Sequence, residues 1–208
     1  MNSAATIHPT AVIEGDVQIG NGTIIDAHVY IKGPAIIGRN NHIRPGAVIG
    51  TDGESRGTPS VGTIIIGDNN LISDLTTIQR SIGDRNTEIG NDCFFMAHSH
   101  LGHDVKLGNE VTIAPGTVIG GHAVIQDGAN IGMGTMVHQF ATVGAYCMIG
   151  MNSTITKDIP PFAMAYGSPA KVKGHNDYRI KKLGIEDLES SDIYLAAVAE
   201  FEKMAGRK

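Results

Sequence analysis

An apolar residue recurs at every sixth position along most of this chain. Isoleucine occupies each such position from Ile7 to Ile49, and the period resumes from Ile66 to Ile78 and, with other apolar residues included, from Ile89 to Ile155. A period of six matches neither the 3.6-residue period of a helix nor the two-residue alternation of an ordinary strand. It is typical of a parallel β-helix built from hexapeptides, so we predict an all-β solenoid.

The positions between the periodic residues support the same fold. The residue two places before each periodic one is mostly small or β-branched, as expected for a second inward-pointing row on a short strand. Cys93 and Cys147 fall on this row, so we predict that both are small buried apolar side chains. Glycine follows many of the periodic residues, which suits tight corners because glycine tolerates positive φ and close backbone approach. Three hexapeptides then make one triangular coil.

The period is broken twice and ends near residue 160. We predict loop excursions over residues 51–62 and 79–88, the first of which is polar and rich in glycine. Pro160 comes where the pattern stops. We therefore expect a β-helix over residues 1–160 and a short α-helical C-terminal extension over residues 161–208.

Two short helices are expected in this extension. Asn176 can cap a helix that ends at Gly184, and Ser190 or Ser191 can cap a second one. One face of the second helix carries Leu195, Val198 and Phe201. The extension is too small to fold alone, so we expect it to pack on the solenoid or on a neighbouring subunit.

Composition narrows the class of protein. The formal net charge of −5 argues against nucleic acid as a partner. Two cysteines without a CxxC motif favour a reducing compartment over a disulfide scaffold. The first residues show no secretory signal, and no apolar run approaches the length of a membrane span. The expectation is a soluble cytoplasmic protein.

Histidines gather on one edge of the predicted solenoid. Five of the nine lie between residues 98 and 138, namely His98, His100, His103, His122 and His138. None falls on an inward-pointing row, and the positions repeat over three successive coils. A solvated row of polar residues would look similar, but the clustering favours a site.

The residue types in this cluster suit general base catalysis. A neutral imidazole accepts protons near pH 7, and Asp104 directly follows His103, where its carboxylate can orient the ring. Backbone N–H groups near Gly121 could stabilise a developing oxyanion. The chain has no GxSxG motif and no obvious Ser or Cys nucleophile, so direct attack by a substrate hydroxyl fits better than a covalent intermediate.

A zinc site is the rival interpretation of these histidines. Other hexapeptide solenoids bind zinc through three histidines, and His98 and His103 have a plausible spacing. In those proteins the third ligand comes from two coils earlier, where this chain has Gly62. We therefore expect no metal.

Four segments together resemble the UDP-N-acetylglucosamine O-acyltransferase family of lipid A biosynthesis. They are MAHSHLGHDVKLGN (96–109), GGH (120–122), VHQF (137–140) and DIPPFAMAYGSPAKVKGHN (158–176). The resemblance covers nearly the whole chain, although the helical tail is shorter than in that family. It implies a left-handed parallel β-helix, a homotrimer with active sites between subunits, and no cofactor.

The resemblance also implies an activity, namely transfer of a 3-hydroxyacyl group from acyl carrier protein to the 3-hydroxyl of a nucleotide sugar. His103 matches the general base, Asp104 its partner, and Gly121 the oxyanion-binding amide. The substrate-contacting positions of the family match His100, His122, His138, Gln139, Asn176 and Lys182.

Some matched positions depart from the family. Gln79 stands where a sugar-side histidine is usual, and Lys182 replaces an arginine, which is not equivalent at a phosphate. Met151 occupies the position that sets acyl length, so we predict a shorter acyl group, or one without the hydroxyl. The first loop offers Asp52 and Glu54, among other residues, as sugar contacts.

Two other functions remain open at this point. One is an acetyl-CoA-dependent sugar acetyltransferase of the same superfamily. The other is a non-catalytic trimeric scaffold, for which a substitution of His103 would change no biochemical output.

Overall fold

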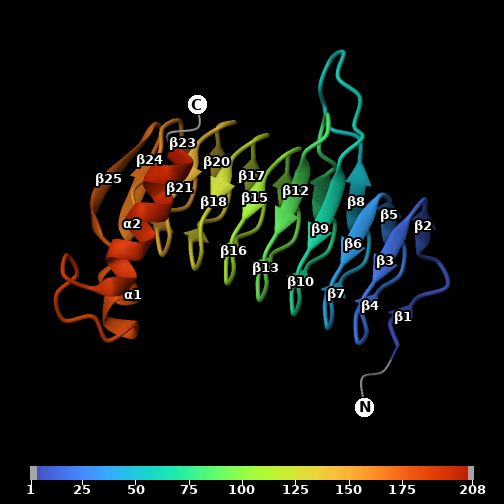
Figure 1. The fold of residues 1–208 in the computed structure, drawn as a ribbon, viewed down its shortest axis with the longest axis horizontal. Coiled ribbons are helices and arrows are strands. Elements are labelled where there is room, and N and C mark those ends of the chain that lie inside the picture. Colours follow the sequence, from blue (N-terminus) through green and yellow to red (C-terminus); the bar gives the residue numbers. More distant parts are fainter. Residues whose placement is uncertain (1–3, 206–208) are drawn as a thin grey trace.

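The computed structural model of the chain describes residues 4–205 and forms a triangular solenoid of stacked coils (Figure 1). Each complete coil contributes one short strand to each of three sheets, and every pairing between neighbouring coils is parallel, such as Thr6 with Ile24. The three-sheet parallel architecture agrees with the predicted β-helix. We name the sheets A, B and C, and the corners that join them A–B, B–C and C–A in chain order.

The strands are short because a corner follows each one. Sheet A contains β1 (Thr6–Ile7), β4 (Ile24–Ile25), β7 (His42–Ile43), β10 (Leu71–Ile72), β13 (Phe94–Phe95), β16 (Thr112–Ile113), β19 (Asn130–Ile131), β22 (Met148–Ile149), β24 (Ala163–Gly167) and β25 (Ala170–His175). Sheet B contains β2 (Val12–Glu14), β5 (Tyr30–Lys32), β8 (Val48–Thr51), β11 (Thr77–Gln79), β14 (His100–Leu101), β17 (Val118–Ile119), β20 (Met136–Val137) and β23 (Thr154–Ile155). Sheet C contains β3 (Val17–Ile19), β6 (Ala35–Ile37), β9 (Thr63–Ile66), β12 (Asn86–Ile89), β15 (Lys106–Leu107), β18 (Val124–Ile125) and β21 (Thr142–Val143).

The periodic residues form the core, as predicted. From Ile25 to Ile155 every one of them is at most 5% exposed, and each buried aliphatic side chain stabilises the fold by about 1.5–3 kcal/mol before chain entropy is subtracted. Ile7 is 46% exposed because, among the described residues, the first coil has a neighbour on one side only. Cys93 and Cys147 are free and buried, and burial raises their pKa to about 11 and about 12. Both are therefore unreactive core residues.

The corner glycines serve close approach rather than positive φ. A Cβ atom added to Gly38 would lie 2.5 Å from the carbonyl oxygen of Gly67 on the next coil. The left-handed conformation falls two residues later, where Asn40 has φ of 54° and Asp104 has φ of 60°. Where this position holds a residue other than glycine, the side chain leaves the corner in the same direction from one coil to the next.

Both breaks in the period are loops, and they differ in size. Residues 52–62 follow β8 and project far from the body of the solenoid (Figure 1). The second loop covers residues 80–85 and is shorter than predicted, because β12 already begins at Asn86 and pairs with β9.

The C-terminal extension is not helical from its start. Residues 163–175 form a hairpin in which β24 continues sheet A beside β22 and β25 pairs with it antiparallel. Ala163 and Ala165 alternate inward and are buried, which is a strand pattern that the prediction missed. The predicted boundary between the solenoid and the extension, after residue 160, stays a prediction.

Two helices follow the hairpin. Helix α1 (Asp177–Lys182) is capped as predicted by Asn176, whose side chain accepts a hydrogen bond from the N–H of Arg179. Helix α2 (Asp192–Ala205) packs near β21 and buries Ala197 beside Phe162 and Ala145 of the solenoid. Leu195 is exposed, so the packed face differs from the predicted one.

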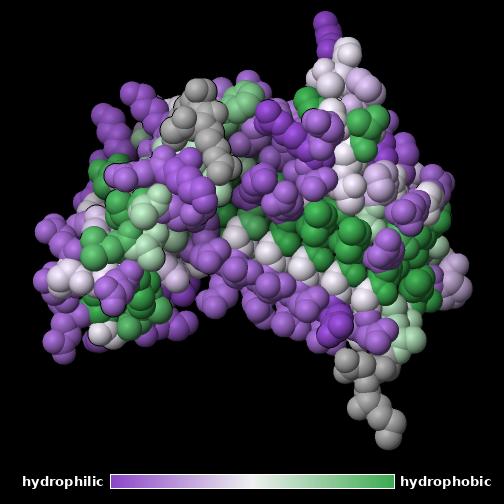
Figure 2. Space-filling model, viewed as in Figure 1, coloured by the Kyte–Doolittle hydropathy of each residue, from purple (hydrophilic) through white to green (hydrophobic). Residues whose placement is uncertain are grey.

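Beyond α2, an apolar band on the same side of the solenoid stays uncovered (Figure 2). On sheet C, Ile36 of β6 is 44% exposed. Neither helix described in residues 4–205 is long and apolar enough to cross a membrane.

Candidate active site

The candidate residues meet at the B–C corner. The corner between β14 and β15 carries His103 and Asp104, the next coil places Gly121 and His122 at the same positions, and the following coil places Gln139 and Phe140 there. Coil-to-coil hydrogen bonds hold this stacking, since the N–H of His122 donates to the His103 carbonyl over 2.9 Å. Regular winding alone therefore brings these residues together.

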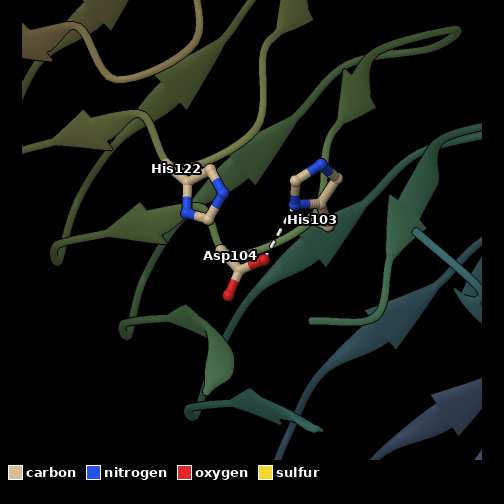
Figure 3. A group of neighbouring side chains, drawn as sticks. All are labelled: His103, Asp104 and His122. Atoms are coloured by element: carbon tan, nitrogen blue, oxygen red, sulfur yellow. Dashed lines mark hydrogen bonds and ion pairs between the residues drawn. The ribbon is translucent and has the colours of Figure 1, made fainter. Parts of the chain in front are cut away.

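His103 and Asp104 form a hydrogen-bonded pair (Figure 3). Nδ1 of His103 lies 2.8 Å from Oδ2 of Asp104. An ionised carboxylate can only accept, so Nδ1 carries the proton and Nε2 has a lone pair for another proton. This is the arrangement of a general base with its orienting carboxylate.

The surroundings of Asp104 keep it ionised. Its carboxylate accepts hydrogen bonds from Oγ of Ser81 over 2.6 Å and from the N–H of Ile82 over 3.2 Å. Burial by itself would raise the pKa of Asp104, but the hydrogen bonds from Ser81, His103 and Ile82 outweigh it and hold the pKa below its ordinary value. Ser81 and Ile82 come from the second loop, where the broken period gave no means of placing them.

Two glycines lie against His103. A Cβ atom added to Gly121 would lie 2.8 Å from Cε1 and 2.9 Å from Nε2 of the His103 ring. A Cβ atom added to Gly53 of the long loop would lie 2.7 Å from Cβ of His103. The ring therefore occupies space that only glycine leaves free, and the backbone of Gly121 lies next to Nε2 of His103.

His122 lies between His103 and Phe140. Its ring meets the His103 ring edge to face at a centroid distance of 5.0 Å and stacks on Phe140 at 4.5 Å with an interplanar angle of 4°. Burial is the largest cause that lowers the pKa of His122, and His103 and Arg85 act in the same direction against the charge of Asp104. His122 is therefore neutral at pH 7.

A groove of about 880 Å³ opens beside this corner. Asp104, His122 and Phe140 line one side of it, and Lys106 and Met204 are among its other lining residues. Met204 belongs to α2, so the C-terminal helix reaches the candidate site. Met204 and Phe140 were not predicted as site residues, because neither carries a titratable or polar side chain.

Three further predicted contacts surround the corner. His100 on β14 is half-buried, its Nδ1 lies 2.7 Å from the Thr77 hydroxyl, and burial lowers its pKa against the charge of Glu54. His138 and Gln139 are exposed directly after β20, two coils after β14. Nδ1 of His138 lies 2.8 Å from the Gln139 carbonyl oxygen, so its ring is turned toward its own chain neighbour.

The remaining predicted contacts lie elsewhere on the same chain. Met151 is exposed after β22, at the A–B corner. Asn176 caps α1 and donates from Nδ2 to the carbonyl of Tyr146 at the C–A corner, and Lys182 is exposed at the end of α1. A single chain therefore does not bring these three to His103.

His103, Asp104 and His122 are also the residues that could hold a metal ion. Their ligand atoms lie within 4.8 Å of one another. However, two ligands of a tetrahedral zinc with bonds of about 2.0–2.1 Å are about 3.3 Å apart, whereas the His103 and Asp104 atoms are only 2.8 Å apart. The geometry fits a shared proton better than a metal.

Comparison with known proteins agrees with this architecture. The family model described as bacterial transferase hexapeptide (six repeats) matches residues 16–51, 86–121 and 122–157. The chain belongs to this hexapeptide family. The matched segments leave out residues 52–85, which contain both loops, and include the whole histidine corner.

The resemblance to the UDP-N-acetylglucosamine O-acyltransferases is confirmed. The chain is 37% identical over 129 residues to an acyl-[acyl-carrier-protein]–UDP-N-acetylglucosamine O-acyltransferase of Gloeothece citriformis, covering 62% of this chain and 47% of the relative. The enzyme of the same name from Pseudomonas putida strain F1 is 36% identical over 126 residues, covering 60% and 49%. The chain thus spans about half the length of these curated relatives.

Solved structures extend the similarity over most of the chain. The UDP-N-acetylglucosamine acyltransferase of Bacteroides fragilis has a TM-score of 0.76 and 32% identity, covering 94% of this chain and 82% of that chain. The corresponding protein of Francisella novicida has a TM-score of 0.79 and 28% identity, covering 99% and 86%. The predicted left-handed β-helix with a short helical tail is confirmed.

Proposed function

We propose that this chain is an O-acyltransferase that moves a 3-hydroxyacyl group from acyl carrier protein to the 3-hydroxyl of a UDP-N-acetylglucosamine-type sugar. The observation that carries the proposal is the His103–Asp104 pair with the Gly121 backbone against its ring, within a hexapeptide solenoid. The names of the relatives supply the donor and acceptor classes.

The chemistry follows from this geometry. Nε2 of His103 takes the proton of the sugar hydroxyl while the hydroxyl oxygen attacks the thioester carbonyl carbon. The negative charge moves to the carbonyl oxygen, where the N–H of Gly121 stabilises it. Collapse of the tetrahedral intermediate breaks the carbon–sulfur bond, and the thiolate that leaves takes the proton from His103. Asp104 stabilises the imidazolium between these two transfers.

A direct assay tests the proposal. The purified full chain is incubated with UDP-N-acetylglucosamine and either 3-hydroxyacyl carrier proteins of graded chain length or acetyl-CoA, and products are identified by mass spectrometry. We expect an O-acylated sugar nucleotide only with the carrier protein. Transfer from acetyl-CoA alone would support the acetyltransferase alternative, which the relatives do not favour. Because Lys182 and Gln79 differ from the family, other sugar nucleotides are tested in parallel.

The homotrimer is part of the proposal. The predicted contacts divide between the B–C corner and two other places on the chain, so a complete site needs a second copy. Three copies that turn sheet B toward a common axis would bring the A–B corner of one to the B–C corner of the next. Size-exclusion chromatography with light scattering is expected to give three times the 21.9 kDa chain mass, and a monomer that is active would contradict this arrangement.

Met151 is the proposed determinant of acyl length. Its side chain is 69% exposed at the A–B corner, where it can close the end of a groove between subunits. We expect M151G to prefer a longer acyl group than the wild type in the graded-length assay. Equal preference in both proteins would remove Met151 from this role.

A cytoplasmic location is proposed on the two free buried thiols, which suit a reducing compartment. Cell fractionation with an antibody to the chain tests it.

A further inference from the structure

Phe140 is unusual for a large aromatic side chain because it is 50% exposed and lies outside the hydrophobic core. It occupies the left-handed corner position with φ of 65°, one coil after His122 with φ of 61°. The N–H of Phe140 donates to the Gly121 carbonyl over 3.1 Å, so the backbone holds the two rings at stacking distance. Core burial does not explain this residue.

The ring contacts run in an unbroken series to the general base. Phe140 stacks flat on His122, and His122 meets His103 edge to face. Asp104 bonds His103 on another side and Gly121 lies against its ring. The orientation of His103 therefore depends on a neighbour that is itself held by Phe140.

We propose that Phe140 is a positioning residue for acyl transfer, which it supports by holding His122 flat and edge-on to His103. This inference rests on the proposed function. Once His103 takes the proton of the acceptor hydroxyl, a positive charge lies 5.0 Å from the His122 ring centre. A neutral His122 does not oppose that charge, whereas a protonated one would repel it.

The electrostatic surroundings of His122 make the role measurable. Burial lowers the pKa of His122, and the Phe140 ring stacked on it excludes water from one face of the imidazole. The charged or titratable groups around His122 are His103, Asp104 and Arg85, with Glu88 and Lys106 farther along the groove. Loss of the stacked ring exposes His122 and raises its pKa toward the ordinary value. A larger fraction of His122 is then charged at pH 6–7, so the acid limb of the kcat profile moves to higher pH.

The test compares F140A, F140L and F140Y with the wild type. F140L lacks the flat ring and so leaves part of the His122 face open to water, whereas F140Y keeps the stack. We expect kcat to fall about tenfold to a hundredfold in F140A and F140L, with the acid limb displaced upward and KM little changed, and to stay near wild type in F140Y. Nuclear magnetic resonance titration of the histidine ring protons should show a raised His122 pKa in F140A and F140L only.

The two readouts separate the possible failures. Unchanged kcat and pH profile in F140A and F140L, or equal loss in all three variants, would overturn the positioning role. A wild-type chain without any transfer to sugar nucleotides would defeat the proposed function, and the role of Phe140 in acyl transfer with it. The ring-proton titration would in that case still show whether Phe140 controls His122.

Discussion

Two corners of this solenoid have the same backbone conformation but differ in the hydrogen bonds that their side chains form. At the C–A corner, Asn109 accepts a hydrogen bond from the N–H of Asn91, and Asp127 accepts one from the N–H of Asn109, so the side chains join one coil to the next. At the B–C corner the equivalent positions hold His103 and Gly121. The ring of His103 bonds instead to its own neighbour Asp104.

The difference shows what the stack requires of a corner. Backbone pairing between coils continues through both corners, so the B–C corner does not need a side-chain ladder to stay in register. Its side chains are therefore available for chemistry, whereas those of the C–A corner stabilise the fold. Substitutions at the two corners should separate activity from stability.

The largest effect is expected for H103A. Removal of the proposed general base should lower kcat roughly a thousandfold to ten-thousandfold, while the unfolding temperature changes little because the ring is outside the core. Steady-state transfer assays and thermal unfolding measure both. H8A is the matched control, since His8 is an exposed histidine after β1 on the first coil, away from the coil of His103, and it should keep wild-type activity. A wild-type rate in H103A would rule out His103 as the general base.

A smaller loss is expected for D104N. An asparagine side chain can donate to Nδ1, which favours the wrong tautomer of His103, so kcat should fall roughly a hundredfold or more. The transfer assay measures the loss, and a proton resonance on Nδ1 of His103 in the wild type that disappears in the variant would support the cause. Loss of activity with that resonance retained would contradict it.

The pH dependence of folding stability tests a second effect of Asp104, apart from its effect on activity. The pKa of this carboxyl is lower in the folded chain than its ordinary value, so its charge stabilises the fold above the ordinary pKa. That contribution is lost as pH falls through the lowered value. We expect D104N to be less stable than wild type at pH 7 and the gap to narrow in acid, as measured by urea unfolding. A gap that stays constant down to acid pH would show that the charge contributes nothing.

G121A should have an intermediate effect. The added methyl group meets the His103 ring at 2.8 Å, so the ring must move while the backbone of the coil can stay in place. We expect kcat to fall about tenfold or more with little change in unfolding temperature. An equal loss of stability and activity would indicate a distorted coil instead.

The smallest effect on activity is expected at the C–A corner. N109A removes the oxygen that accepts from both the N–H and Nδ2 of Asn91, at 2.9 and 3.1 Å. The free energy of unfolding should fall by about 1–2 kcal/mol, with kcat per folded chain unchanged. A fall in kcat at permissive temperature would show that the two corners are not independent.

Periodicity made the solenoid and its core predictable, because a count of six determines which side chains point inward. The same count places Met151 and His103 on different corners and so anticipates that they do not meet in one chain. It cannot place Ser81 or Ile82, since they lie within the second break, where the period gives no register. The hairpin at 163–175 was not predicted. Pro160 and Pro161 just before it suggested the end of the strands, and the alternation of buried alanines in β24 is too short to stand out.

The division of the candidate residues between corners has a genetic consequence. In the proposed ring of three copies, one chain that lacks His103 and another whose A–B corner is blocked by a bulky substitution at Met151 carry defects in different halves of each shared cleft. Coexpression of two such inactive alleles would assemble mixed rings in which some clefts receive an intact half from each parent. Partial activity would then return from two inactive genes.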